Sequence, residues 1–128
     1  MKYLLDTRVL LWASIWPDRL PAAARAILVD PDSQLLFSSI GIWEVAIKAE
    51  RGRTDFDVDA RLLRQGLLDN GYIELPITSE HAAAVADLPA LHKDPFDRML
   101  VAQAKAEGVL LLTSDRQVAD YPGPIRLV

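Results

Sequence analysis

Short apolar runs alternate with helical segments along this chain, and the alternation limits the folds that are open to it. The runs expected to be strands are 3–5, 34–37, 72–77, 109–113 and 125–128. The segments between them that are expected to be helices are 8–15, 22–29, 40–50, 59–68, 80–87 and 95–107. This alternation predicts βαβ units and an α/β fold, with a central parallel sheet covered by helices on both faces.

The length and composition fit a single domain spanning residues 1–128. A chain of 128 residues can bury a substantial core, and 51% hydrophobic with 25% charged residues is ordinary for a compact protein. The chain has no cysteine, which excludes disulfides, thiolate metal ligands and a cysteine nucleophile. Asp6 and Arg8 interrupt the first apolar run before a signal peptide or a membrane span can form. We therefore expect a cytoplasmic protein without a membrane partner.

The helix expected at 95–107 has an acidic residue among its apolar side chains. Asp94 suits the N-cap, Pro95 suits the first helical position, and Gly108 stands where a helix usually stops. At about 100° per residue, apolar side chains occupy most of the helix circumference, and Asp97 falls among them. Two interpretations stay open: Asp97 closes a capping-box-like exchange in the first turn, or it is a functional carboxylate.

Four acids are placed by simple connectivity near one edge of the expected sheet. Asp6 and Asp115 follow two of the strands, and Glu44 lies about one turn into the helix after another strand. Asp97 opens a helix that leads into a strand, and such a crossover helix runs antiparallel to its strands. All four therefore belong near the carboxyl ends of the strands, where open α/β sheets bind their ligands.

Each of these acids also has a purely structural interpretation. Asp6 is well placed to cap the following helix, and Asp115 to form an Asx turn. Glu44 has Lys48 four residues further on, which is a helical ion pair worth about 0.3–0.5 kcal/mol. Sequence pattern alone does not choose between these roles and a shared site.

A cluster of four carboxylates would need a compensating positive charge. Two carboxylates about 6 Å apart repel by roughly 3 kcal/mol at an effective dielectric near 20. Oxygen ligands, without cysteine or a histidine pair at metal spacing, favour Mg²⁺ or Mn²⁺ over Zn²⁺. Such a site supports hydrolysis at phosphorus by an activated water. The net charge of −4 argues against a nucleic-acid partner, but that objection weakens if four of the acids are metal ligands.

Four blocks of the chain resemble PIN-domain ribonucleases, most closely the VapC-type toxins of type II toxin–antitoxin pairs. They stand in the order of the family and span nearly the whole chain: LLDTRVLLW (4–12), SIGIWEVAIK (39–48), HKDPFDRML (92–100) and LTSD (112–115). The resemblance implies a three-layer α/β/α sandwich and a Mg²⁺- or Mn²⁺-dependent endoribonuclease that acts as a toxin. It also implies an RNA substrate, a small antitoxin that blocks the site, and a homodimer.

The resemblance also assigns roles to individual residues. The metal-binding and catalytic acids that it implies are Asp6, Glu44, Asp97 and Asp115. The residues that it places around them, to orient a ligand or water, are Thr7, Thr113 and Ser114.

One position departs from the family pattern. Where this subgroup commonly has histidine after Asp-Thr, this chain has Arg8. Arginine can contact a substrate phosphate, but it cannot transfer a proton because it stays protonated. Next to the acids it would also weaken metal binding by partly neutralising them. A catalytically inert PIN-like protein that keeps only partner binding is therefore one alternative.

Other basic and aromatic residues have weaker assignments. Those expected near the mouth of the site, to contact an RNA backbone or only to add surface charge, are Arg51, Arg53, Lys93, Arg98 and Arg116. His92 is either solvated in its loop or within reach of substrate, and His81 is given no role. Base stacking needs exposed rings, so three residues are assigned instead to the core or a dimer interface: Trp12, Trp16 and Trp43.

An alternative from another class is a phospho-accepting receiver domain. It shares the chain length, the parallel sheet and acids at strand ends. A receiver needs a pair of acids after the first strand and a lysine after the last central one. Here Asp6 stands alone and Arg116 follows Asp115, so the fit is poor.

Overall fold

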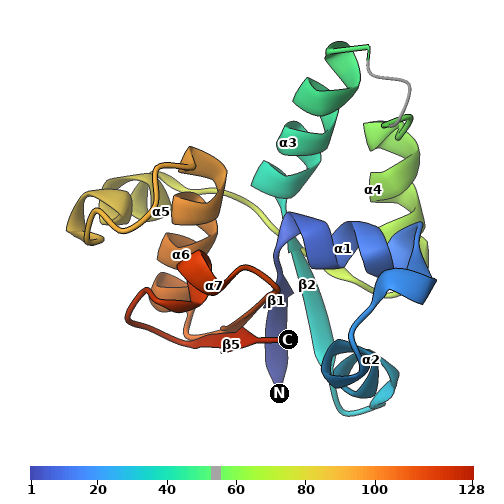
Figure 1. Cartoon of the computed structure of the whole chain (residues 1–128), viewed down its shortest axis with the longest axis horizontal. Coiled ribbons are helices and arrows are strands. Elements are labelled where there is room, and N and C mark those ends of the chain that lie inside the picture. Colours follow the sequence, from blue (N-terminus) through green and yellow to red (C-terminus); the bar gives the residue numbers. More distant parts are fainter. Residues whose placement is uncertain (53–55) are drawn as a thin grey trace.

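The structure, a computed structural model, describes residues 1–52 and 56–128. Strands and helices alternate along it, with two short 3₁₀ helices, η1 and η2 (Figure 1). The elements are β1 (Lys2–Leu5), α1 (Thr7–Ser14), η1 (Pro17–Arg19), α2 (Ala22–Val29), β2 (Gln34–Ser38), α3 (Ser39–Glu50), α4 (Ala60–Asp69), β3 (Ile73–Leu75), α5 (Ser79–Ala84), η2 (Val85–Asp87), α6 (Pro95–Glu107), β4 (Leu110–Thr113), α7 (Arg116–Ala119) and β5 (Ile125–Leu127). Within the described residues, no helix has the length and apolar character needed to cross a membrane.

The five strands form a parallel sheet in the order β3-β2-β1-β4-β5. Leu5 at the end of β1 pairs with Phe37 of β2 and with Leu112 of β4, so the carboxyl ends of these three strands lie level. From β1 the strand order runs outward to β2 and β3 on one side and to β4 and β5 on the other. The strand order therefore reverses at β1, and the carboxyl end of β1 is the kind of switch point at which α/β sheets bind ligands. In receiver domains the second strand lies at the edge of the sheet. Here β2 lies between β3 and β1, so the receiver alternative is wrong.

Alternate residues of β1 enter two separate cores, one on each face of the sheet. Leu4 packs with Leu100 of α6 and Leu111 of β4, whereas Leu5 packs with Leu10 of α1 and Leu112 of β4. Helices α5, α6 and α7 lie on one side of the sheet, and α1, α2 and α4 lie on the other (Figure 1). Each buried leucine contributes about 1.5–3 kcal/mol of transfer free energy. The predicted three-layer α/β/α sandwich is confirmed.

The expected capping residues set the helix boundaries. The Asp94 carboxylate accepts a hydrogen bond from the Phe96 N–H at 2.8 Å, which begins α6. The Ser38 hydroxyl accepts from the Ile40 N–H at 3.1 Å, which begins α3. Gly108 ends α6 at φ 65°, a left-handed conformation that glycine adopts without strain. The predicted start of α6 at Asp94 and its end at Gly108 are confirmed.

Two expected elements are shorter in the structure. The strand expected at 72–77 covers only Ile73–Leu75, because Pro76 has no N–H and the Ile77 N–H donates to the Ser39 hydroxyl at 3.2 Å. The helix expected at 80–87 is divided into α5 and η2. Residues 53–55, which include Arg53, lie outside the described residues.

His81, given no role from sequence, is a buried part of the start of α5. Its Nδ1 accepts from the Thr78 N–H at 3.1 Å, and the Thr78 hydroxyl accepts from the His81 N–H at 3.2 Å. Its Nε2 lies 3.2 Å from the Glu107 carboxylate at the end of α6. His81 thus closes a capping box and joins α5 to α6.

A buried amide on α6 joins the helix to two strands. The Gln103 side chain is 0% exposed, and its Oε1 accepts from the Ser38 hydroxyl at 2.5 Å. Its Nε2 donates to the Leu75 and Pro76 carbonyls, each at 3.4 Å. These contacts hold the ends of β2 and β3 against α6.

We expect Gln103→Leu to lower the free energy of unfolding by about 2–4 kcal/mol, because the change leaves buried polar groups without partners. Chemical denaturation with a fixed slope measures this loss directly. The matched control is Gln65→Leu on the exposed face of α4, which should change stability by less than about 0.5 kcal/mol. Equal denaturation midpoints for the two variants would show that the Gln103 contacts contribute nothing.

Candidate active site

The four acids predicted to converge line one open cavity. Asp6 follows β1, Glu44 lies on α3, Asp97 is in the first turn of α6, and Asp115 follows β4. The cavity has a volume of about 590 Å³, within the range of about 300–1,000 Å³ that is usual for ligand sites. The non-acidic residues that line it are Thr7, Arg8, Leu11, Trp12, Trp16, Arg19, Lys48 and His92. Asp94 also lines it, so five acids face one space.

Asp6 is the most buried of these acids and is held at both carboxylate oxygens. One oxygen, Oδ1, accepts from the Val9 N–H at 2.9 Å, so Asp6 does cap α1 as its structural interpretation required. The other oxygen, Oδ2, accepts from the Thr113 hydroxyl at 2.6 Å. Burial raises the pKa of Asp6 above its usual value, and these two hydrogen bonds act in the opposite direction. The cavity therefore holds a fixed carboxylate that lacks a full compensating charge.

Glu44 takes part in the predicted ion pair and also faces the cavity. Its Oε2 lies 3.2 Å from the Lys48 ammonium. Its Oε1 is buried and has no hydrogen-bond partner among the described residues, and the same is true of the Thr7 hydroxyl. Residues as buried as Thr7, at 6% exposure, and Glu44, at 9%, rarely leave such atoms unpaired. Two residues that line the cavity thus have a buried oxygen whose hydrogen-bonding capacity is unused.

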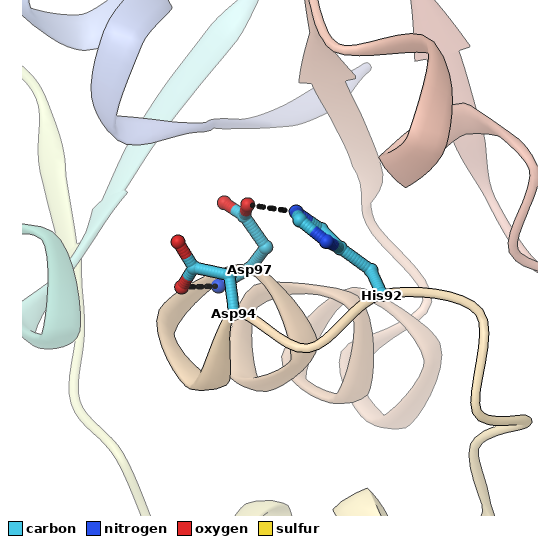
Figure 2. Close-up of side chains that lie close together, drawn as sticks. All are labelled: His92, Asp94 and Asp97. Carbon is cyan, nitrogen blue, oxygen red and sulfur yellow. Dashed lines mark hydrogen bonds and ion pairs between the residues drawn. The ribbon is translucent and has the colours of Figure 1, made fainter.

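Asp97 lies at the centre of the cluster, next to a histidine (Figure 2). Its Oδ2 is 2.9 Å from His92 Nε2, which is 3.9 Å from Asp115 Oδ2. Burial, followed by the charges of Asp94, Asp6 and Glu44, raises the pKa of Asp97 from 3.8 to about 6, against the lowering effect of the His92 contact. Asp97 is therefore electrostatically linked to Asp94, Asp6 and Glu44.

The Thr113 hydroxyl connects two of the acids. It donates to Asp6 and accepts from the Asp115 N–H at 3.1 Å. Asp115 Oδ1 accepts from the Gln117 N–H at 2.8 Å and so caps α7, which leaves Oδ2 toward His92. The neighbouring Ser114 hydroxyl is buried, with no hydrogen-bond partner among the described residues, and does not line the cavity.

The basic residues divide into two groups. Arg8, Arg19 and Lys48 line the cavity, and the charge of Arg8 lowers the pKa of Asp6. Arg98 does not line it. Its guanidinium instead donates to the Pro89 carbonyl at 2.9 Å, the Tyr121 hydroxyl at 3.0 Å and the Val85 carbonyl at 3.2 Å. Arg98 therefore stabilises the loop before α6 and does not face the acids as expected.

The amino-acid sequence of residues 3–124 matches the PIN domain family. The chain belongs to this family. It is 32% identical over 122 residues to ribonuclease VapC22 of Mycobacterium tuberculosis, covering 94% of this chain and 92% of that protein.

Solved structures share the fold of this PIN domain. VapBC2 from Rickettsia felis, bound to a DNA fragment from its promoter, aligns with a TM-score of 0.73 at 15% identity, covering 100% of this chain and 99% of that one. DNA-bound VapBC from Salmonella typhimurium aligns with a TM-score of 0.67 at 17% identity, covering 98% and 97% of the two chains.

The structure places two side chains whose positions the sequence left open. Of the two possibilities for His92, it favours the one within reach of the site, because His92 lines the cavity 2.9 Å from Asp97. The only sequence signal for this was its place in the same loop as Asp94, just before α6. Trp43 is 58% exposed, with its ring edge-on to Phe96 at 5.5 Å, so it is not a core residue. Its place in a dimer interface stays a prediction.

Proposed function

We propose that this PIN domain is a Mg²⁺- or Mn²⁺-dependent endoribonuclease. The observation that carries the proposal is the cavity lined by four acids from separate elements, two of whose lining residues, Glu44 and Thr7, also have an unpaired buried oxygen. Repulsion within such a cluster is relieved by a cation, and oxygen donors of this kind suit Mg²⁺ and Mn²⁺. The residues present therefore fit the metal that the fold family implies.

In this proposal Asp6, Glu44, Asp97 and Asp115 hold the cation. When bound, the cation supplies an acidified water and stabilises the charge that develops on the phosphate and the leaving oxygen. The Thr113 hydroxyl keeps Asp6 and Asp115 in fixed relative positions. Arg8, Arg19 and Lys48, which are the basic residues on the cavity wall, contact the phosphates of the RNA strand.

The same proposal extends to the biological role, which is that of a toxin with a cognate antitoxin. The relative from Mycobacterium tuberculosis is named a ribonuclease VapC, and the structures from Rickettsia felis and Salmonella typhimurium are VapBC complexes. These names support a ribonuclease with a VapB-type partner. The small antitoxin that blocks the cavity, the homodimer and the cytoplasmic location are part of the proposal. A small reading frame for a DNA-binding protein beside the gene would add to this support.

A catalytically inert partner-binding protein is the second candidate, and Arg8 is the observation that favours it. The Arg8 charge acts on Asp6, the most buried of the acids, and so competes with a cation for the same carboxylate. Under this alternative, Arg8→His restores cleavage to a protein that binds metal but does not cut RNA.

The test is an RNA cleavage assay on protein stripped with EDTA. We expect no cleavage of structured RNA without metal, cleavage after addition of Mn²⁺, and loss of cleavage when EDTA is added back. Mn²⁺ binding should be measured in parallel by titration. Binding without cleavage would favour the inert alternative, and the absence of both binding and cleavage would overturn the proposal.

A further inference from the structure

His92 belongs to the acid cluster that lines the cavity. Its ring is directed at Asp97 rather than at solvent, and its side chain is only 19% exposed (Figure 2). The Nε2 atom lies 2.9 Å from Asp97 Oδ2 and 3.9 Å from Asp115 Oδ2. His92 Nε2 therefore lies within 4 Å of a carboxylate oxygen from each of two other segments.

The backbone of His92 is fixed by a buried tyrosine. The His92 N–H donates to the Tyr121 hydroxyl at 2.9 Å, and that hydroxyl donates to the His92 carbonyl at 3.2 Å. Arg98 donates to the same hydroxyl at 3.0 Å, and Tyr121 is fully enclosed in the core around α6. Such anchoring of a loop holds a donor atom in a reproducible position.

The two distances from His92 Nε2, the shorter of which is also a hydrogen-bond distance, are compatible with ligands of one ion. A cation that lies about 2.1 Å from its ligands holds adjacent ligand atoms about 3 Å apart and opposite ones about 4.2 Å apart. The distance of 2.9 Å from His92 Nε2 to Asp97 Oδ2 matches an adjacent pair. The distance of 3.9 Å to Asp115 Oδ2 is close to that of an opposite pair.

The unpaired atoms of the cavity add independent support for an ion in this cluster. Thr7 and Glu44 both line this cavity, and each has a buried oxygen, Thr7 Oγ1 and Glu44 Oε1, without a partner among the described residues. Asp94 Oδ1 accepts from the Phe96 and Asp97 N–H groups, and Asp94 also offers a carboxylate oxygen within 4.8 Å of ligand atoms of His92 and Asp97. We assign Asp94 to the helix cap.

We propose that the metal site of this protein has mixed nitrogen and oxygen ligation, with His92 Nε2 as a direct ligand beside Asp97 and Asp115. This inference rests on the proposed function and specifies its metal. An imidazole ligand favours transition-metal ions, whereas Mg²⁺ prefers oxygen ligands in an octahedron. The site therefore selects Mn²⁺ over Mg²⁺. A site made only of carboxylates would discriminate far less between these two ions.

Pulsed electron paramagnetic resonance on the Mn²⁺-loaded full chain tests the ligand directly. The chain has only two histidines, and His81 is occupied by Thr78 and Glu107. We expect an imidazole ¹⁴N coupling that changes to ¹⁵N when only the histidines are labelled. The coupling should vanish in His92→Gln and persist in His81→Gln. Labelling of the wild type identifies a histidine nitrogen even if His81→Gln does not fold.

Metal titrations give a second readout. We expect His92→Gln to weaken Mn²⁺ binding about tenfold or more, and Mg²⁺ binding by less than about threefold, because Mg²⁺ gains little from an imidazole. Bound Mn²⁺ without histidine coupling would overturn the inference and leave the proposed function intact. If the wild type binds no Mn²⁺ at all, the proposed function fails, and this inference fails with it.

Discussion

Replacing Asp97 by asparagine is expected to lower metal-dependent RNA cleavage about 100-fold or more and, in the same protein, to stabilise the metal-free fold at neutral pH. The loss of activity follows from removing a charged metal ligand at the centre of the cluster. The gain in stability follows because Asp97 is surrounded by Asp94, Asp6 and Glu44, whose charges oppose its ionisation. Asparagine keeps the shape and removes the charge.

The pH dependence of this stabilisation has a defined sign. The pKa of Asp97 is raised from 3.8 to about 6 in the folded protein, so between these values the folded state holds a proton that the unfolded state lacks. The stability that this proton brings is present below about pH 4 and is lost as the pH rises through 6. The rise in the pKa of Asp97 from 3.8 to about 6 corresponds to a change of about 3 kcal/mol at most in the free energy of unfolding. Solvent screening reduces this change to about 1–2 kcal/mol.

Denaturation of metal-free wild type and Asp97→Asn between pH 4 and 8 measures this effect. We expect the variant to be about 1–2 kcal/mol more stable at pH 8, and we expect the difference to disappear near pH 4. Addition of Mn²⁺ should raise the melting temperature of the wild type and leave the variant unchanged. The control is Asp87→Asn, which removes the same charge from an exposed residue outside the cavity. Unchanged cleavage by Asp97→Asn would mean that a different site or a contaminating nuclease is responsible.

The parts of the fold that could be predicted from sequence depend on interactions between near neighbours. Asp94, Pro95 and Gly108 define α6 through cap geometry within one turn, and the structure confirms these boundaries. The continuous apolar runs predict strands because a strand that is buried on both faces has apolar side chains on both. The length of β3 was overestimated because the Ile77 N–H donates to the hydroxyl of Ser39, a residue distant in the chain, instead of to a neighbouring strand.

The detailed arrangement of the site depends on contacts between distant segments. Tyr121 is hydrogen-bonded to His92, 29 residues away in the sequence, and Thr113 is hydrogen-bonded to Asp6, 107 residues away. Such pairings are set by the sheet register, in which Leu5 lies beside Leu112. Arg98 was expected near the cavity because a charged residue on a buried helix usually reaches solvent, whereas three oxygen acceptors in neighbouring segments bind it here. No local sequence pattern contains that information.

Thr113→Val is expected to weaken metal binding and RNA cleavage about 10- to 100-fold without changing any proposed ligand. Valine has the shape of threonine, but it cannot donate to Asp6 or accept from the Asp115 N–H, and so both acids lose a fixed partner. The Thr113 hydrogen bond lowers the pKa of Asp6, so its removal raises that pKa further. Because a metal binds the deprotonated carboxylate, Mn²⁺ binding should then require a higher pH than in the wild type.

Mn²⁺ titrations across a pH series separate this effect from simple destabilisation. Thr113→Ser keeps the hydroxyl and should retain the wild-type pH dependence, with only the loss of a buried methyl group. Thr113→Val should move the midpoint of Mn²⁺ binding to higher pH while the protein remains folded by circular dichroism. If both variants bind Mn²⁺ with the wild-type pH dependence, the hydroxyl does not control Asp6, and the acids are held by the backbone of β1 and β4 alone.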